Sequence, residues 1–217
     1  MSREHLDTLT EIRSLMERSS KFLSLSGLSG ISAGLVALAG AGAAYFRLNN
    51  DWLTLAGYDH LAELSADERS DVVSFLMLDA AAVLIGALVL GVFFTVRKAR
   101  QQGLSVWNAT SRRLLWALAV PLVTGGVFCL ALIHHNLLWL AFPSTLIFYG
   151  LALLNGSKFT IRYVEYLGLS EVALGLLALF ATGYTLLTWT IGFGLLHIVY
   201  GIFMYYKYDK SPAESVR

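Results

Sequence analysis

Asp79 and His197 are the ionisable residues that lie deepest inside long apolar stretches of this chain. Burying such a group in hydrocarbon costs roughly 2.5 kcal/mol or more, so it is retained where a partner compensates for it. Both lie about 10–12 Å from the same end of their stretches, at 1.5 Å per residue. A structural hydrogen bond between the two helices is the preferred interpretation. A protonatable pair that serves proton-coupled transport or acid sensing is the alternative.

Three histidines form a second group that could do chemistry. His134 and His135 end an apolar stretch on the side where a long acidic loop carries His60. Imidazoles and carboxylates together bind zinc and other transition metals. No H-x-x-x-H or H-E-x-x-H spacing supports such a site. Water-exposed histidines are therefore the preferred interpretation, and metal binding by His60, His134 and His135 is the alternative.

Other kinds of chemistry lack the residues they need. Cys129, the single cysteine, has no neighbouring histidine to act as its base. A membrane haem would need two deep histidines that face each other, and only His197 is deep. The net charge of +1 offers no basic surface for nucleic acid. We expect no cofactor and no nucleic-acid partner, and a non-enzymatic protein is preferred over an enzyme.

The composition indicates that helices in a membrane position these residues. Hydrophobic residues make up 56% of the 217 residues and charged residues 14%, with a mean hydropathy of +0.62. A soluble chain of this length could not bury so much apolar surface. About 20 apolar residues cross a bilayer as a helix. The sequence therefore predicts an all-α integral membrane fold with six transmembrane helices. Their expected ranges are 25–47, 72–96, 114–134, 137–156, 168–187 and 189–206.

The distribution of basic residues predicts the topology. Lys and Arg resist translocation, so they collect in cytoplasmic loops. Of the 16 Lys and Arg residues, only Arg47 and Arg69 fall on the opposite side of the six helices, in a loop that is otherwise acidic. Both termini are therefore expected in the cytoplasm. The six helices then form three consecutive hairpins, each of which rises from the cytoplasmic side and returns to it.

The segments outside the helices complete the predicted organisation. Residues 1–24 alternate charged residues with apolar ones at helical spacing, which indicates an amphipathic leader helix on the cytoplasmic membrane surface. A solvated leader helix that positions the first transmembrane helix is the alternative. Residues 25–206 form the transmembrane domain, with an acidic outer loop at 48–71. Residues 207–217 form a cytoplasmic tail.

Two acidic residues are interpreted as features of helix ends. Ser65 and Glu68 have the spacing of a capping box, which would begin the helix that follows the outer loop. Glu171 is placed in the first turn of the fifth helix, at the cytoplasmic interface. An acid there favours the helix dipole and remains partly hydrated.

An internal repeat supports the hairpin arrangement. The pattern that starts at Gly27 in the first helix recurs from Gly168 in the fifth. A weaker match joins Tyr149-Gly150 in the fourth helix to Tyr200-Gly201 in the sixth. Repeats that run in the same direction indicate pseudo-rotational symmetry about the membrane normal.

Gly30 and Gly34 place a small-residue face on the first helix. Their spacing is the one that lets two helices approach closely in lipid. Helix packing within the chain is the preferred interpretation of this face. The interface of a homo-oligomer is the alternative.

The last hairpin resembles a known family. The run EVALGLLALF at 171–180, followed by residues 189–194 and by YGIF at 200–203, resembles the acid-resistance HdeD-type membrane family. This resemblance implies a small six-span protein of the bacterial inner membrane, built of three hairpins and with a stress-related role. It implies no catalytic residue. Residues 18–30 resemble uncharacterised bacterial six-span membrane proteins.

Three classes of function follow, in order of preference. The first is a non-enzymatic stress-related or interaction protein of the inner membrane. The second is a small proton-coupled transporter or proton-responsive channel that uses Asp79 and His197, and the third is a membrane-embedded metal-dependent hydrolase. A transporter predicts a water-accessible cavity that reaches Asp79, whereas an interaction protein predicts a closed, dry bundle. The lipid bilayer is the expected partner in each case.

Overall fold

The computed structural model describes residues 25–48 and 65–209, and within these ranges the chain is helical, without strands. The first five helices are α2 (Gly27–Arg47), α4 (Ala66–Gln101), α5 (Ala109–His134), α6 (Leu138–Ser157) and α7 (Tyr163–Phe180). A 3-10 turn, η1 (Thr182–Tyr184), leads into the last helical segment. This segment contains α8 (Thr185–Trp189), the π-helix η2 (Thr190–Leu196), α9 (His197–Met204) and the π-helix η3 (Tyr205–Asp209).

Six helical segments in the described part of the chain are long and apolar enough to cross a membrane. Their outer surfaces fit this interpretation, because large apolar side chains such as Leu88, Val123 and Phe180 are more than half exposed. The prediction of an all-α chain with six apolar helices is thereby confirmed. The leader at 1–24, most of the outer loop and the tail beyond Asp209 lie outside the described residues.

Several helices begin or end away from their predicted bounds. α4 starts at Ala66 instead of residue 72, because Ser65 and Glu68 form the predicted capping box in both directions. α7 covers Tyr163–Phe180 instead of 168–187, since the chain turns at η1 before the last segment begins at Thr185. Hydropathy locates the apolar centre of a helix but not the polar turns that extend it, which accounts for both differences.

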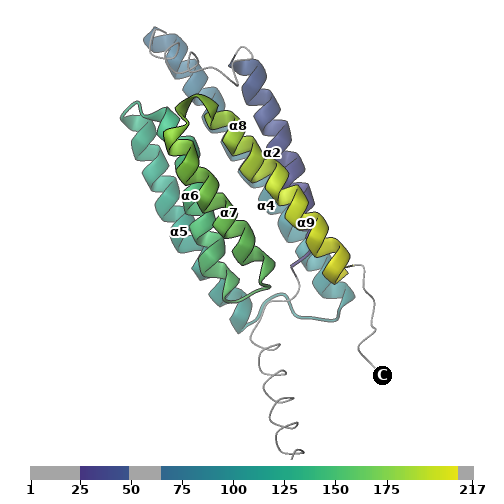
Figure 1. The fold of residues 1–217 in the computed structure, drawn as a ribbon. Coiled ribbons are helices and arrows are strands. Elements are labelled where there is room, and N and C mark those ends of the chain that lie inside the picture. Colours follow the sequence, from purple (N-terminus) through teal and green to yellow (C-terminus); the bar gives the residue numbers. More distant parts are fainter. Residues whose placement is uncertain (1–24, 49–64, 210–217) are drawn as a thin grey trace, which may run out of the picture.

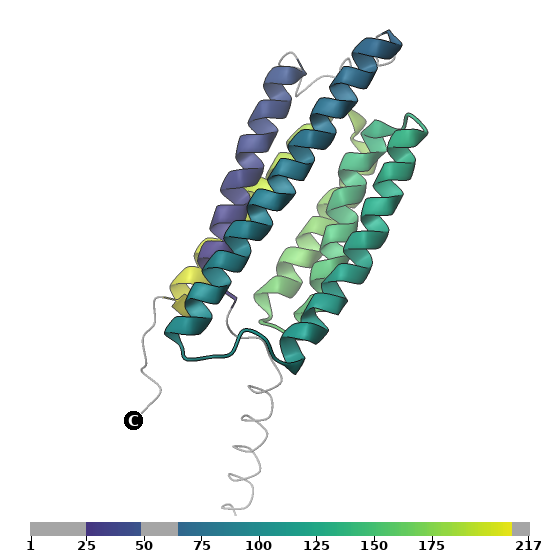
Figure 2. The ribbon, with the colours of Figure 1, turned by 180° about the vertical axis from the view of Figure 1, so that it is seen from behind.

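The helices fall into two groups (Figures 1 and 2). α2 packs between α4 and the last segment, while α6 packs between α5 and α7. The two groups meet where the last segment contacts α6 and α7. The loops at the ends of the helices keep consecutive helices antiparallel, so each hairpin returns to the end of the bundle from which it started.

Glycines bring α2 into close contact with the last segment. A Cβ atom added to Gly30 would lie 3.1 Å from the Cα atom of Gly201, and one added to Gly34 would lie 2.6 Å from the carbonyl oxygen of Gly194. Only glycines allow backbones to approach this closely. The predicted small-residue face of Gly30 and Gly34 therefore packs within the chain.

The same contacts recur between α7 and α6. Gly27 lies against Gly201 and Tyr205, just as Gly168 lies against Gly150 and Leu154. The spacing between these partners is the same, residue for residue, in both interfaces. The internal repeat of the sequence thus recurs as a repeated helix-helix contact, with α7 in the place of α2 and α6 in the place of the last segment.

An ion pair ties three helix ends together at one end of the bundle. Lys98, near the end of α4, lies 2.6 Å from Asp209 Oδ1 at the end of η3. The second carboxylate oxygen of Asp209 accepts hydrogen bonds from the Ser26 hydroxyl and from the Gly27 N–H, at 2.9 Å each. The start of α2 and the ends of α4 and η3 therefore lie on the same side, as the hairpin arrangement requires.

Candidate functional site

Glu171 lies at the centre of α7 and is completely buried, with 0% of its surface exposed. It is about 12 Å from the start of the helix and about 14 Å from its end, at 1.5 Å per residue. Gly168 and Gly175, which lie on the same helical face, pack against α6 and turn this face inward. The prediction that Glu171 is a hydrated residue at the helix start is wrong. The error arose because the predicted span began five residues too late.

His197 faces Glu171 from the last helical segment. It is 5% exposed, and its Nδ1 atom lies 3.0 Å from the Gly192 carbonyl oxygen and 3.4 Å from Glu171 Oε1. Because a carbonyl oxygen only accepts hydrogen bonds, Nδ1 carries a proton. In the neutral imidazole, Nε2 then accepts the hydrogen bond from the Tyr149 hydroxyl, at 2.7 Å. Three helical segments thus meet at one imidazole ring.

The carboxyl group of Glu171 has no hydrogen-bond donor among the described residues. Both oxygens are buried and unpartnered, and the 3.4 Å separation from His197 is an ion-pair contact without hydrogen-bond geometry. The carboxyl group lies against Gly192, since a Cβ atom added there would come within 2.6 Å of Glu171 Oε2. An unpaired buried carboxylate is costly, so this carboxyl group is suited to holding or exchanging a proton.

The π-helix η2 shapes the wall of this centre. Its wider turns leave the Gly192 carbonyl oxygen available to the His197 ring. Phe193 stacks on the same ring, with centroids 5.9 Å apart and planes at 17°. Tyr149 and Trp189 in turn contact Phe193. Aromatic rings therefore cover one face of the imidazole. We call Tyr149, Glu171 and His197 the buried polar centre.

The structure does not bring Asp79 and His197 together. Asp79 is half-buried on α4, and its carboxylate lies 3.3 Å from where a Cβ atom of Gly40 would be. The backbone of His197 lies at the same distance from the corresponding position of Gly30. Gly30 and Gly40 are about 15 Å apart along α2, at 1.5 Å per residue. The predicted pair is therefore wrong, and Glu171 takes the place that Asp79 was expected to fill.

The histidines proposed for a metal site lie elsewhere. His134 and His135 are exposed at the end of α5, with their rings 5.2 Å apart. No group of three or more metal-ligating side chains occurs among residues 25–48 and 65–209. His60 lies outside these residues, so the three-histidine site stays an untested alternative.

No protein-family model, curated protein or solved structure matches this chain. The resemblance to HdeD-type proteins therefore remains a prediction. Any conclusion about function has to come from the residues of the buried polar centre and from their surroundings.

One member of the centre had a signal in the sequence and another had none. Glu171 lies three residues after Gly168 and four before Gly175, so small residues flank it on one helical face. That pattern places an acid in a helix-helix contact. Tyr149 carried no comparable signal, because its hydroxyl reaches His197 only through the contact between α6 and the last segment.

Proposed function

We propose that this chain is a proton-responsive membrane protein whose buried polar centre binds a proton between Glu171 and His197. The observation that supports the proposal best is the fully buried Glu171 carboxyl group, which has no hydrogen-bond donor and faces an imidazole nitrogen at 3.4 Å. This is the second of the three classes expected from the sequence, with Glu171 in place of Asp79.

In this proposal six helices cross the bilayer as three hairpins, with both termini in the cytoplasm of a bacterium and the chain in its inner membrane. The distribution of Lys and Arg supports this orientation. The Lys98–Asp209 ion pair also supports this orientation. Together with the Ser26 hydrogen bond, it joins the end of α4, the end of η3 and the start of α2, which should all lie on the cytoplasmic side.

The chemistry of the centre follows from its net charge. A low-dielectric site disfavours any net charge, so the favoured states are neutral Glu171 with neutral His197, or carboxylate with imidazolium. Because Nδ1 already carries a proton, the imidazolium forms when Nε2 is protonated and the Tyr149 hydroxyl turns to accept a hydrogen bond from it. A proton that passes from Glu171 to His197 in this way leaves the total charge unchanged. Uptake of a further proton leaves an imidazolium beside a neutral acid, which weakens the contact between α7 and the last segment. Acid therefore acts on helix packing.

The burial of the centre favours proton binding over solute transport. Glu171 and His197 are 0% and 5% exposed, which leaves no room for a larger substrate beside them. A groove on the surface of α4 is lined by residues between Leu88 and Gln101, and Asp79 is not among them. A stress-related role, as the HdeD-type resemblance implies, is compatible with a protein that responds to acid.

Infrared difference spectroscopy of the protein in lipid nanodiscs tests the proposal. As the pH is lowered, we expect a protonated-carboxyl band that is absent from Glu171→Gln and present in Asp79→Asn. Asp79 is the matched control, since it is the other acid within an apolar helix but lies against Gly40. The proposal fails if the band persists in Glu171→Gln or if Asp79→Asn alone removes it.

A further inference from the structure

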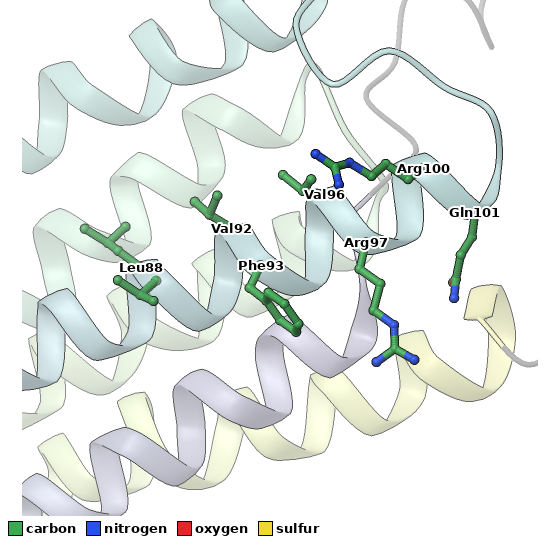
Figure 3. Close-up of a pocket in the computed structure, with 8 residues that line it drawn as sticks. Leu88, Val92, Phe93, Val96, Arg97, Arg100 and Gln101 are labelled. Carbon is green, nitrogen blue, oxygen red and sulfur yellow. The ribbon is translucent and has the colours of Figure 1, made fainter.

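A groove runs along the surface of α4 between two rows of side chains (Figure 3). One row consists of Leu88, Val92, Val96 and Arg100, and the other of Val89, Phe93, Arg97 and Gln101. Side chains four residues apart form a ridge on a helix, and two adjacent ridges enclose a groove. Each row is apolar for two or three turns and then becomes polar at the same end of the helix.

No other helix of the described residues fills this groove. α4 makes its extensive contacts with α2, which leaves Val92 and Phe93 60% and 56% exposed. Gly91, in the row beside Leu88 and Val92, has no atom of another residue within 4 Å of where its Cβ would lie, so this side of the groove is open as well. The apolar part of the groove, from Leu88 to Val96, is about 12 Å long at 1.5 Å per residue.

The basic end of the groove carries an uncompensated charge. Arg97 and Arg100 are exposed, and neither forms an ion pair with an acid of the described residues. The sequence contains no Asp or Glu between Asp79 and Glu165. The two guanidinium groups point away from each other in Figure 3, but the Cβ atoms of residues three apart on a helix lie about 5–6 Å from each other, so rotation of these long side chains can bring both groups to one phosphate.

We propose that this groove binds an anionic phospholipid, with an acyl chain between the two ridges and the headgroup phosphate held by Arg97 and Arg100. An extended apolar channel that ends in two arginines matches a lipid with a negative headgroup in both shape and charge. The proposal rests on the membrane insertion proposed above, which would place these arginines at the cytoplasmic leaflet. It does not depend on the buried polar centre.

The test measures lipid retention by the full-length protein. The purified protein is placed in phosphatidylcholine nanodiscs, phosphatidylglycerol is titrated in, and bound lipid is counted by native mass spectrometry. We expect the wild type to prefer phosphatidylglycerol at least tenfold and the Arg97→Gln/Arg100→Gln variant to lose that preference. Lys158→Gln/Arg162→Gln is the matched control, because it removes the same charge outside the groove and should behave as the wild type.

A further variant and a soluble probe identify the ligand. Val92→Gln should weaken retention of phosphatidylglycerol, because it places a polar group between the ridges. Equal loss of lipid preference in both double variants would overturn the proposal. Displacement of phosphatidylglycerol by millimolar inorganic phosphate would also overturn it. So would the finding that the two arginines hold a dimer of the protein together and that no lipid is bound. If the protein stays in the membrane fraction but shows no lipid preference, the lipid-binding proposal fails and the proposed membrane insertion stands. Protein absent from the membrane fraction refutes the membrane insertion itself.

Discussion

Glu171 and His197 occupy positions that the repeat fills with nonpolar residues elsewhere. Glu171 corresponds to Gly30 of α2, and His197 corresponds to Leu146 of α6, so each copy of the contact contains only one of the two ionisable groups. Each copy of the helix-helix contact therefore forms without the other group. Since a buried ion pair is often no more stable than an apolar replacement, stability alone does not account for a carboxyl group and an imidazole at this place. The proton binding proposed above would account for both groups.

The Tyr149 hydroxyl group is the part of the centre whose removal has the clearest energetic consequence. Tyr149→Phe leaves His197 Nε2 buried without a hydrogen-bond partner, which should cost about 1–3 kcal/mol of unfolding free energy. Unfolding of the variant by SDS in mixed micelles, followed by circular dichroism, measures this loss. We also expect the protonated-carboxyl band of Glu171 to appear at a different pH in this variant but not to disappear, because Tyr149 contacts the imidazole and not the carboxyl group.

The repeat supplies the control for this prediction. Tyr200 occupies the equivalent position on the last segment, and its hydroxyl lies 3.3 Å from Ser170 Oγ in a partly buried site. Tyr200→Phe should cost less than Tyr149→Phe and leave the carboxyl band unchanged. Equal effects of both substitutions on the band would show that Tyr149 has no special relation to His197.

At the scale of helices, glycine contacts determine how the elements meet. Gly201 contacts backbone atoms, namely the N atom of Ile31 at 2.6 Å and the carbonyl oxygen of Gly27 at 2.8 Å from where a Cβ would lie. Backbone atoms cannot move aside as the end of a side chain can. The position of His197, one turn before Gly201, therefore depends on this close approach.

A single added methyl group tests that dependence. Gly201→Ala should push the last segment away from α2 and cost about 1–3 kcal/mol, the usual penalty for overpacking. Gly126→Ala is the control, since nothing lies within 4 Å of the added group and alanine favours a helix by up to about 1 kcal/mol. SDS unfolding of both variants gives the comparison. If Gly201→Ala is as stable as Gly126→Ala, the contact does not limit the spacing of these helices.

At the scale of the whole molecule, the sequence predicted the elements and missed the site. Periodic apolar stretches and the capping box at Ser65 located six helices, because hydropathy and local hydrogen bonds act within a few residues. The partner of His197 was misassigned, since equal depth in two helices does not say which helices are neighbours. Glu171 was misplaced by an error of five residues at one helix end, which is enough to move a side chain from an interface to the centre of a bundle.

The orientation of the whole bundle gives the last prediction. Ser105 lies in the basic connection between α4 and α5, whereas His135 lies at the opposite end of α5, where no Lys or Arg adjoins it in sequence. In a Cys129→Ala background, we expect His135→Cys to react with a membrane-impermeant thiol reagent in intact cells. Ser105→Cys should react only after permeabilisation, because positively charged loops stay in the cytoplasm. Labelling of Ser105→Cys from outside would invert the proposed topology, and it would move the arginine end of the α4 groove to the outer leaflet.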